Sequence, residues 1–156
     1  MSISSEQFKD FFRHHGAGVS AITAFDEAGQ PFGFTASSLA SLSARPALAT
    51  VNLAQSSSTA EVLRIGSKIA IHALSSENQA IAAELAGPRA QRFKSSGWDL
   101  GQGAPINQHA NAILFGEVAQ IYPVAESLIL VIDCKAVDSR SFPERPLIYF
   151  NREYLK

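Results

Sequence analysis

A cluster of small hydroxyl residues in the first third of the chain is able to contact a polar ligand. It lies within Gly33-Phe34-Thr35-Ala36-Ser37-Ser38-Leu39-Ala40-Ser41-Leu42-Ser43. Such residues at the end of a strand allow main-chain N–H groups and side-chain hydroxyls to converge on a ligand that approaches the backbone closely, such as a polar ring edge. The alternative is a polar loop that forms only its own local turns.

A second hydroxyl cluster has the chemistry of an anion site. Asn52-Leu53-Ala54-Gln55-Ser56-Ser57-Ser58-Thr59 runs into a segment expected to be a short helix, residues 58–65, which Gly66 would end. The unpaired N–H groups and the positive end of the dipole point out of a helix N-terminus, so a phosphate fits there. The alternative is an ordinary helix cap, which needs only one of these hydroxyls.

The other reactive groups indicate no catalytic or metal site. His14 and His15 are adjacent and so point to different faces of a helix, while His72 and His109 are isolated in the sequence. Cys134 lies in an apolar strand, where a buried and inert thiol is expected. The sequence has neither metal-ligand spacing nor a Gly-x-Ser-x-Gly nucleophile motif. We therefore expect no catalytic side chain and no metal ligand.

Length and charge suit a single domain spanning residues 1–156. A chain of this length buries enough surface to fold without disulfides, and its one cysteine excludes an internal disulfide framework. The 13 basic and 14 acidic residues are interspersed, so nucleic acid and anionic membranes are not expected as partners. The polar N-terminus lacks the features of a secretory signal, and residues 128–137 are too short to span a membrane. We expect a cytoplasmic protein.

The pattern of apolar residues predicts a mainly β chain with three helices. Helical spacing of apolar residues with flanking Ser or Gly predicts helices over 5–15, with Ser5 as N-cap, 58–65 and 77–86. Residues 89–108 are predicted to be irregular, and loops of that length are usually functional or disordered. Strands are expected over 19–25, 31–36, 48–53, 68–74, 112–122, 127–137 and 147–150.

These elements favour an antiparallel barrel or sandwich with a few peripheral helices, because most of the strands are joined by short turns. A doubly wound α/β fold is the alternative, since residues 48–86 alternate strand and helix. That alternative lacks the Gly-x-Gly-x-x-Gly fingerprint after any expected strand.

Seven short motifs occur along most of the chain in a characteristic order. They are Gly18-Val19-Ser20-Ala21-Ile22-Thr23; Gly33-Phe34-Thr35-Ala36-Ser37-Ser38 with Ser41-Leu42-Ser43 and Pro46; Val51-Asn52-Leu53 with Ser57-Ser58-Thr59; Gly66 ahead of Ile69-Ala70-Ile71-His72-Ala73-Leu74; Arg92-Phe93; Gly116-Glu117-Val118; and Pro146-Leu147-Ile148-Tyr149. In this order they resemble the flavin reductase-like family, the FMN-binding split β-barrel proteins. The Thr-Ala-Ser-Ser block at its distance from the Ser-Ser-Thr block is the most specific feature.

The resemblance implies a homodimeric split barrel, a Greek-key antiparallel barrel with a few peripheral helices. It would bind FMN, with FAD as the alternative, and take NADH or NADPH as co-substrate. Thr35, Ala36, Ser37 and Ser38 would face the ring and ribityl part of the flavin, with Asn52 and Leu53 lining the same site. Ser57, Ser58 and Thr59 would hold the phosphate, and Arg92 and Phe93 would border the site. Hydride would pass from nicotinamide to flavin N5, and reduced flavin would go to a partner monooxygenase.

The chain departs from the family pattern at one turn. Where the family commonly has Gly-Asp-His before its last long strand, this chain has Ala125-Glu126-Ser127, so no imidazole is present there. This favours one alternative function, an FMN-binding flavoprotein for electron transfer, sensing or storage that does not turn over nicotinamide. A split barrel for another ligand, such as pyridoxal phosphate or haem, is a third hypothesis.

Overall fold

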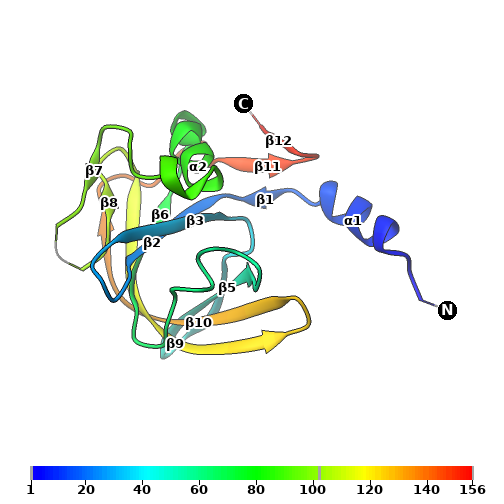
Figure 1. Cartoon of the computed structure of the whole chain (residues 1–156). Helices are drawn as coiled ribbons and strands as arrows, with labels where there is room; N and C mark the ends of the chain where they lie inside the picture. Colours follow the sequence, from blue (N-terminus) through cyan, green and yellow to red (C-terminus); the bar gives the residue numbers. More distant parts are fainter. Residues whose placement is uncertain (1, 102, 156) are drawn as a thin grey trace.

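Seven strands form one antiparallel sheet in the computed structural model, which describes residues 2–101 and 103–155. The strands are β2 (Ser20–Phe25), β3 (Pro31–Ala36), β4 (Ala40–Ala44), β5 (Ala47–Ala54), β6 (Lys68–Ala73), β9 (Ala112–Val124) and β10 (Ser127–Ser139). Their order across the sheet is β3-β2-β6-β9-β10-β5-β4, and the long β9–β10 hairpin joins its two halves (Figure 1). This confirms the antiparallel β prediction, and the doubly wound alternative is wrong.

Smaller elements surround this sheet. A three-stranded sheet, in the order β1-β11-β12, joins the two ends of the chain. Its strands are β1 (Ala17–Gly18), β11 (Ile148–Phe150) and β12 (Glu153–Tyr154), and a separate pair is formed by β7 (Trp98–Asp99) and β8 (Ile106–Asn107). The helices are α1 (Ser5–Arg13) and α2 (Gln79–Ala86), with 3-10 turns at Ser76–Asn78 and Arg89–Gln91. No helix in the described part of the chain is long and apolar enough to cross a membrane.

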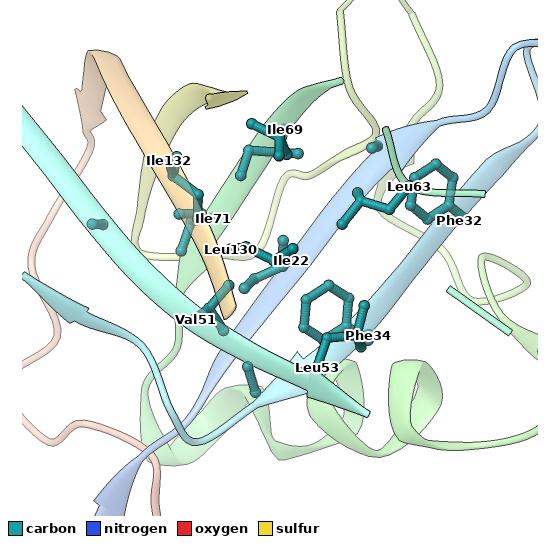
Figure 2. Close-up of a cluster of buried hydrophobic side chains, with 14 residues drawn as sticks. Ile22, Phe32, Phe34, Val51, Leu53, Leu63, Ile69, Ile71, Leu130 and Ile132 are labelled. Carbon is teal, nitrogen blue, oxygen red and sulfur yellow. The ribbon is translucent and has the colours of Figure 1, made fainter. Parts of the chain in front are cut away.

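The sheet curls around a hydrophobic core. Strands from the two ends of the sheet meet there, since Phe34 of β3 and Leu53 of β5 lie in the same cluster (Figure 2). Val51, Ile71 and Ile132 fill the space between them and are nearly inaccessible to solvent. This closure is the physical basis of the split barrel, because alternate residues of each strand point inward.

A second core lies on the outer side of the barrel, under α2. Ile81, Ala82 and Leu85 of this helix are buried against residues such as Ile113 and Leu147. Strand β3 therefore has apolar neighbours on both faces: the barrel core on one side and α2 on the other.

Most of the predicted strands are confirmed, whereas one predicted helix is wrong. Residues 58–65 form successive turns with a single i to i+4 bond, from Leu63 N–H to Thr59 O at 3.0 Å, and no helix. Residues 40–44, expected as part of a polar loop, form the edge strand β4. The first helix begins after Ser4, not Ser5, because the Ser4 hydroxyl and the Gln7 side chain form a reciprocal capping box. The helix expected over 77–86 begins at Gln79.

Helix α1 lies beside the barrel and buries none of its residues (Figure 1). Phe8, Phe11 and Phe12 are all more than half exposed. The helix is held at its C-terminal end, where Asn151 N–H donates to Arg13 O at 2.6 Å. It therefore forms one side of an open groove.

Candidate functional site

A groove of about 710 Å³ separates α1 from the barrel. Ser37, Ser38 and Asn52 line its barrel side. The opposite side and the floor are lined by Phe8, Lys9, Phe12, Arg13, His15, Tyr149 and Arg152, and the apolar lining residues are Ala17, Leu39 and Ala40. The groove thus brings together the two ends of the chain, Ser37 and Ser38 of the first hydroxyl cluster, and Asn52 at the start of the second cluster.

Ser38 joins the first hydroxyl cluster to β5. Its Oγ donates to the main-chain oxygen of Asn52 at 3.2 Å and accepts from the Asn52 N–H at 2.9 Å. Both backbone groups of Asn52 are satisfied by this one hydroxyl, so the residue is fixed in place with its side chain at the groove. Ser38 and Asn52, which belong to two separate sequence motifs, are therefore in direct contact.

The other predicted residues of these segments lie elsewhere. Thr35 Oγ1 donates to Ala82 O of α2 at 2.6 Å, on the outer face of β3. Ala36 and Leu53 are buried in the barrel core. The roles assigned to these three residues by family resemblance stay predictions.

The Ser57–Thr59 segment is packed more tightly than an open anion site. Thr59 is only 2% exposed, and Ser57 Oγ accepts from Ala60 N–H at 3.1 Å within a turn. Because these residues start turns and no helix, the helix-dipole argument for a phosphate does not apply to them. None of the three lines the groove under α1.

The turn that departs from the family pattern lies next to the second hydroxyl cluster. Gln55 holds the turn in place, since its Nε2 donates to Ala125 O at 2.9 Å and to Ser127 O at 3.1 Å. Gln55 N–H also donates to Glu126 O at 3.0 Å. Ala125 has φ +50°, a conformation that favours glycine, which the family commonly has at this position.

Arg92 and Phe93 lie on the outer face of β3, away from the groove. Arg92 donates from Nε to Gly87 O at 3.0 Å and from Nη1 to Gly33 O at 2.8 Å. Phe93, with φ +62°, packs its ring edge against Trp98 at 4.8 Å between centroids. The structure therefore does not bring this pair together with Ser37, Ser38 and Asn52 within one chain.

Glu84 organises the loop that carries this pair, and sequence reasoning missed it. Its carboxylate accepts from Lys94 N–H at 2.7 Å, from Ser95 N–H at 3.0 Å, from Ser95 Oγ at 2.6 Å and from Trp98 Nε1 at 3.0 Å. Burial acts to raise the pKa of Glu84, but the bonds from Ser95, Trp98 and Lys94 outweigh it and hold the pKa below its ordinary value. Nothing in the local sequence distinguishes this glutamate from an exposed helical one.

Replacing Glu84 by alanine is expected to loosen residues 94–98 and to lower the free energy of unfolding by about 1–2 kcal/mol, because four donors lose a charged acceptor that is partly screened by solvent. Trp98 is the only tryptophan, so its fluorescence emission should shift to the red. Glu77→Ala, at an exposed position beside the same helix, is the control. Equal emission spectra for the two variants would contradict this role.

His72, a buried residue of β6, connects the loop that contains Asn107 to the sheet. Its Nε2 accepts from Asn107 N–H at 3.1 Å, so its Nδ1 carries the proton and donates to Ala21 O at 3.0 Å. Burial lowers the pKa of His72 to about 4. The imidazole is therefore neutral and structural. Cys134 is half-buried, and burial raises the pKa of its thiol.

Comparisons with known proteins agree with this architecture. Residues 12–156 match the flavin reductase like domain. The chain is 30% identical over 159 residues to the NADH:FMN oxidoreductase of Rhodococcus qingshengii, which covers 99% of this chain and 82% of that protein.

Two solved structures share the fold. The flavin reductase domain protein of Arthrobacter sp. FB24 superposes with a TM-score of 0.89 at 33% identity, covering 97% of this chain and 94% of that one. The styrene monooxygenase flavin reductase of Pseudomonas putida S12 has a TM-score of 0.82 at 22% identity over 95% of each chain. Since the domain match spans nearly the whole chain and the relatives align along their length, this protein belongs to the flavin reductase-like domain family.

Proposed function

We propose that this protein is an NAD(P)H-dependent flavin reductase that binds FMN in the groove between α1 and the barrel. The observation that carries the proposal is the Ser38–Asn52 contact at the groove wall, because it joins the last serine of the Thr-Ala-Ser-Ser block to Asn52 beside a cavity of suitable size. The relative that is an NADH:FMN oxidoreductase supports the same activity.

The groove suits a flavin in size and chemistry. Its volume of about 710 Å³ lies within the usual range of cofactor sites, roughly 300–1,000 Å³. Phe8, Phe12 and Tyr149 offer aromatic surface for a flat ring. Ser37 and Asn52 supply donors and acceptors for the polar edge of a ring or a ribityl chain.

The chain's own residues orient and shield the reactants. A bound flavin supplies the hydride-accepting chemistry, and no side chain of the groove needs to act as a nucleophile or base. Ser38 holds Asn52 at a fixed position, and the open side of the groove leaves room for a nicotinamide ring to stack on the flavin. The flavin contacts that the family resemblance assigns to Thr35, Ala36, Leu53, Ser57–Thr59, Arg92 and Phe93 remain part of this proposal.

A homodimer and a partner monooxygenase are further parts of the proposal. The exposed phenylalanines of α1 support a second subunit, because a contiguous exposed apolar surface usually marks an interface. Many members of the family pass reduced flavin to a monooxygenase, and we propose the same fate here.

The activity is tested by following NADH and NADPH absorbance with purified protein and added FMN. We expect catalytic oxidation of at least one nucleotide well above a protein-free control. Absence of oxidation, in a sample whose fluorescence shows that FMN is bound, would contradict the reductase proposal.

The second candidate function is a flavin carrier without nicotinamide turnover, and the Ala125-Glu126-Ser127 turn favours it. If this turn limits hydride transfer, replacing it by Gly-Asp-His should raise kcat/KM for the preferred nucleotide without changing FMN affinity. Glycine also suits the positive φ at position 125, so this variant should fold. Equal kcat/KM values before and after the replacement would show that the turn does not determine the activity.

A further inference from the structure

The size of the inward-facing side chains changes abruptly near one end of the barrel. Residues directly opposite one another on β2, β6 and β9 form rows across the sheet. One row belongs to or packs against the barrel core (Figure 2) and has large side chains, those of Ile22, Ile71 and Leu114. The next row, two residues along each strand and therefore on the same face, has small ones, those of Ser20, Ala73 and Ala112.

The small side chains leave a cavity of about 270 Å³ at this end of the barrel. We call it the barrel cup, and Ser20, Ala73 and Ala112 line it together with Leu39 and Val137. None of its lining residues in the described part of the chain is charged. Mouths of β-barrels are common sites for small molecules, and an apolar cavity of about 150 Å³ is large enough for benzene. The cup therefore has room for a compact molecule of one or two rings.

An aromatic side chain lies at the rim of the cup. Phe142 lines the cup and yet is 69% exposed. The loop that carries it is fixed at both ends, since Ser141 N–H donates to Asn111 O at 3.0 Å and Ser76 N–H donates to Arg145 O at 2.9 Å. Phe142 is thus held beside the cup with most of its surface available, and a second ring is a favourable partner for it.

Leu39 separates the cup from the groove under α1. Its side chain packs against the barrel core, and the residue lines both the groove and the cup. It directly follows Ser38, whose hydroxyl accepts from Asn52 N–H at the groove wall. A molecule in the cup would therefore contact a residue that also forms part of the groove.

We propose that the barrel cup binds a small uncharged aromatic molecule and that this molecule regulates the groove through Leu39. An ion does not suit the cup, because a charge would leave water there without a partner. Phe142 favours a ring over an aliphatic chain. Binding in the cup is independent of the proposed function, whereas its regulatory effect rests on that function for the identity of the groove's ligand.

Calorimetric titration of the intact protein with indole tests the site. Indole is an uncharged molecule of two fused rings, and we expect it to bind with roughly millimolar affinity or better. Indole-3-carboxylate has the same rings and a negative charge. It should bind roughly tenfold more weakly, because the cup offers no countercharge.

Two substitutions alter the cup in different ways. Ala73→Leu fills it, and Val137→Asp places a charge in it at a position that is 56% exposed. Each should weaken indole binding roughly tenfold. Ala136 is exposed and lies next to Val137 on the other face of β10, so Ala136→Leu and Ala136→Asp are the matched controls and should bind indole like the wild type.

Regulation is measured by titrating FMN with and without saturating indole. A ring packed against Leu39 would hold this wall of the groove in place, so the affinity for FMN should rise by roughly fivefold. Because such coupling is reciprocal, FMN should raise the affinity for indole by the same factor. In Leu39→Ala the mutual effect should disappear while indole still binds.

The proposal is overturned if indole does not bind, or if it binds Ala73→Leu and Val137→Asp as it binds the Ala136 controls. Displacement of indole by FMN would overturn it too, since the cup would then be part of the flavin groove. An affinity for FMN that indole leaves unchanged would remove the link through Leu39.

Sedimentation of Phe142→Ser tests the other possible occupant, a second copy of this chain. The variant should keep the oligomeric state of the wild type. Conversion of a dimer into a monomer would show that a second copy covers the cup, and would overturn the proposal. The activity assay is separate: a protein that binds indole in the cup but does not oxidise NADH would retain this site and lose the reductase function, and an active reductase that does not bind indole would do the opposite.

Discussion

Between pH 6.5 and pH 4 the protein is expected to lose about 3 kcal/mol of stability through His72 alone. Burial lowers the pKa of this histidine from 6.5 to about 4 in the folded state. The unfolded chain therefore binds a proton that the folded chain does not, so stability rises with pH across this window. The contribution is fully present above pH 6.5 and is lost as pH falls through 4, at about 1.4 kcal/mol per pH unit.

The neutral form of His72 is favoured because both ring nitrogens already form hydrogen bonds. Protonation of Nε2 would turn the acceptor for Asn107 N–H into a second donor, inside a site next to the ring of Trp98. Arg140 also disfavours the charged form through space. A proton on this ring would therefore release the loop that contains β8 from the sheet.

Urea unfolding at several pH values between 4.5 and 7 measures the effect. The wild type is compared with His72→Gln, which cannot take up a proton, and the difference between their stabilities should shrink as pH falls. The NMR signal of the His72 ring gives a second test that does not depend on the variant's folding. Parallel stability curves, or a His72 ring that titrates near pH 6.5, would contradict the prediction.

The sequence predicts the sheet well because each strand's local pattern agrees with its place in the fold. Residues 31–36 alternate between the barrel core and the α2 side, and the short turn before them makes the hairpin with β2 almost unavoidable. The helix expected at 58–65 does not form. Turns at the start of this segment and Gly66, at φ +88°, hold the segment so that Leu63 packs in the barrel core. Tertiary packing of one leucine outweighs a weak helical preference there.

The sequence predicts only some of the residues that line the groove, and strand geometry explains which ones. Successive residues of a strand point to opposite faces, and neither Thr35 nor Ala36 lines the groove. Ser37 and Ser38 lie beyond the end of β3 and do line it. Tyr149 and Arg152 come from the other end of the chain. They lie next to α1 because β1 pairs with β11. No local sequence pattern near Arg13 predicts this pairing.

Gly33 is expected to be the least replaceable residue of the first hydroxyl motif, although it touches no ligand. A Cβ added there would lie 2.7 Å from Ile22 O and 3.2 Å from Phe93 Cζ, and the first of these is main chain of the neighbouring strand. The strands cannot separate to make room, because β2 pairs with β3 along its whole length. Gly33→Ala should therefore cost about 2–3 kcal/mol, in the range of overpacked cores.

Gly18→Ala is the matched control, because nothing lies within 4 Å of a Cβ at that position. Urea denaturation should place this variant within about 0.5 kcal/mol of the wild type. In Gly33→Ala the strain should also reach the loop, since Arg92 Nη1 donates to Gly33 O and Phe93 packs on the same residue and on Trp98. Tryptophan emission should then change at urea concentrations below the main transition. If both alanine variants unfold at the same midpoint, the close contact of β2, β3 and Phe93 does not explain why this motif begins with glycine.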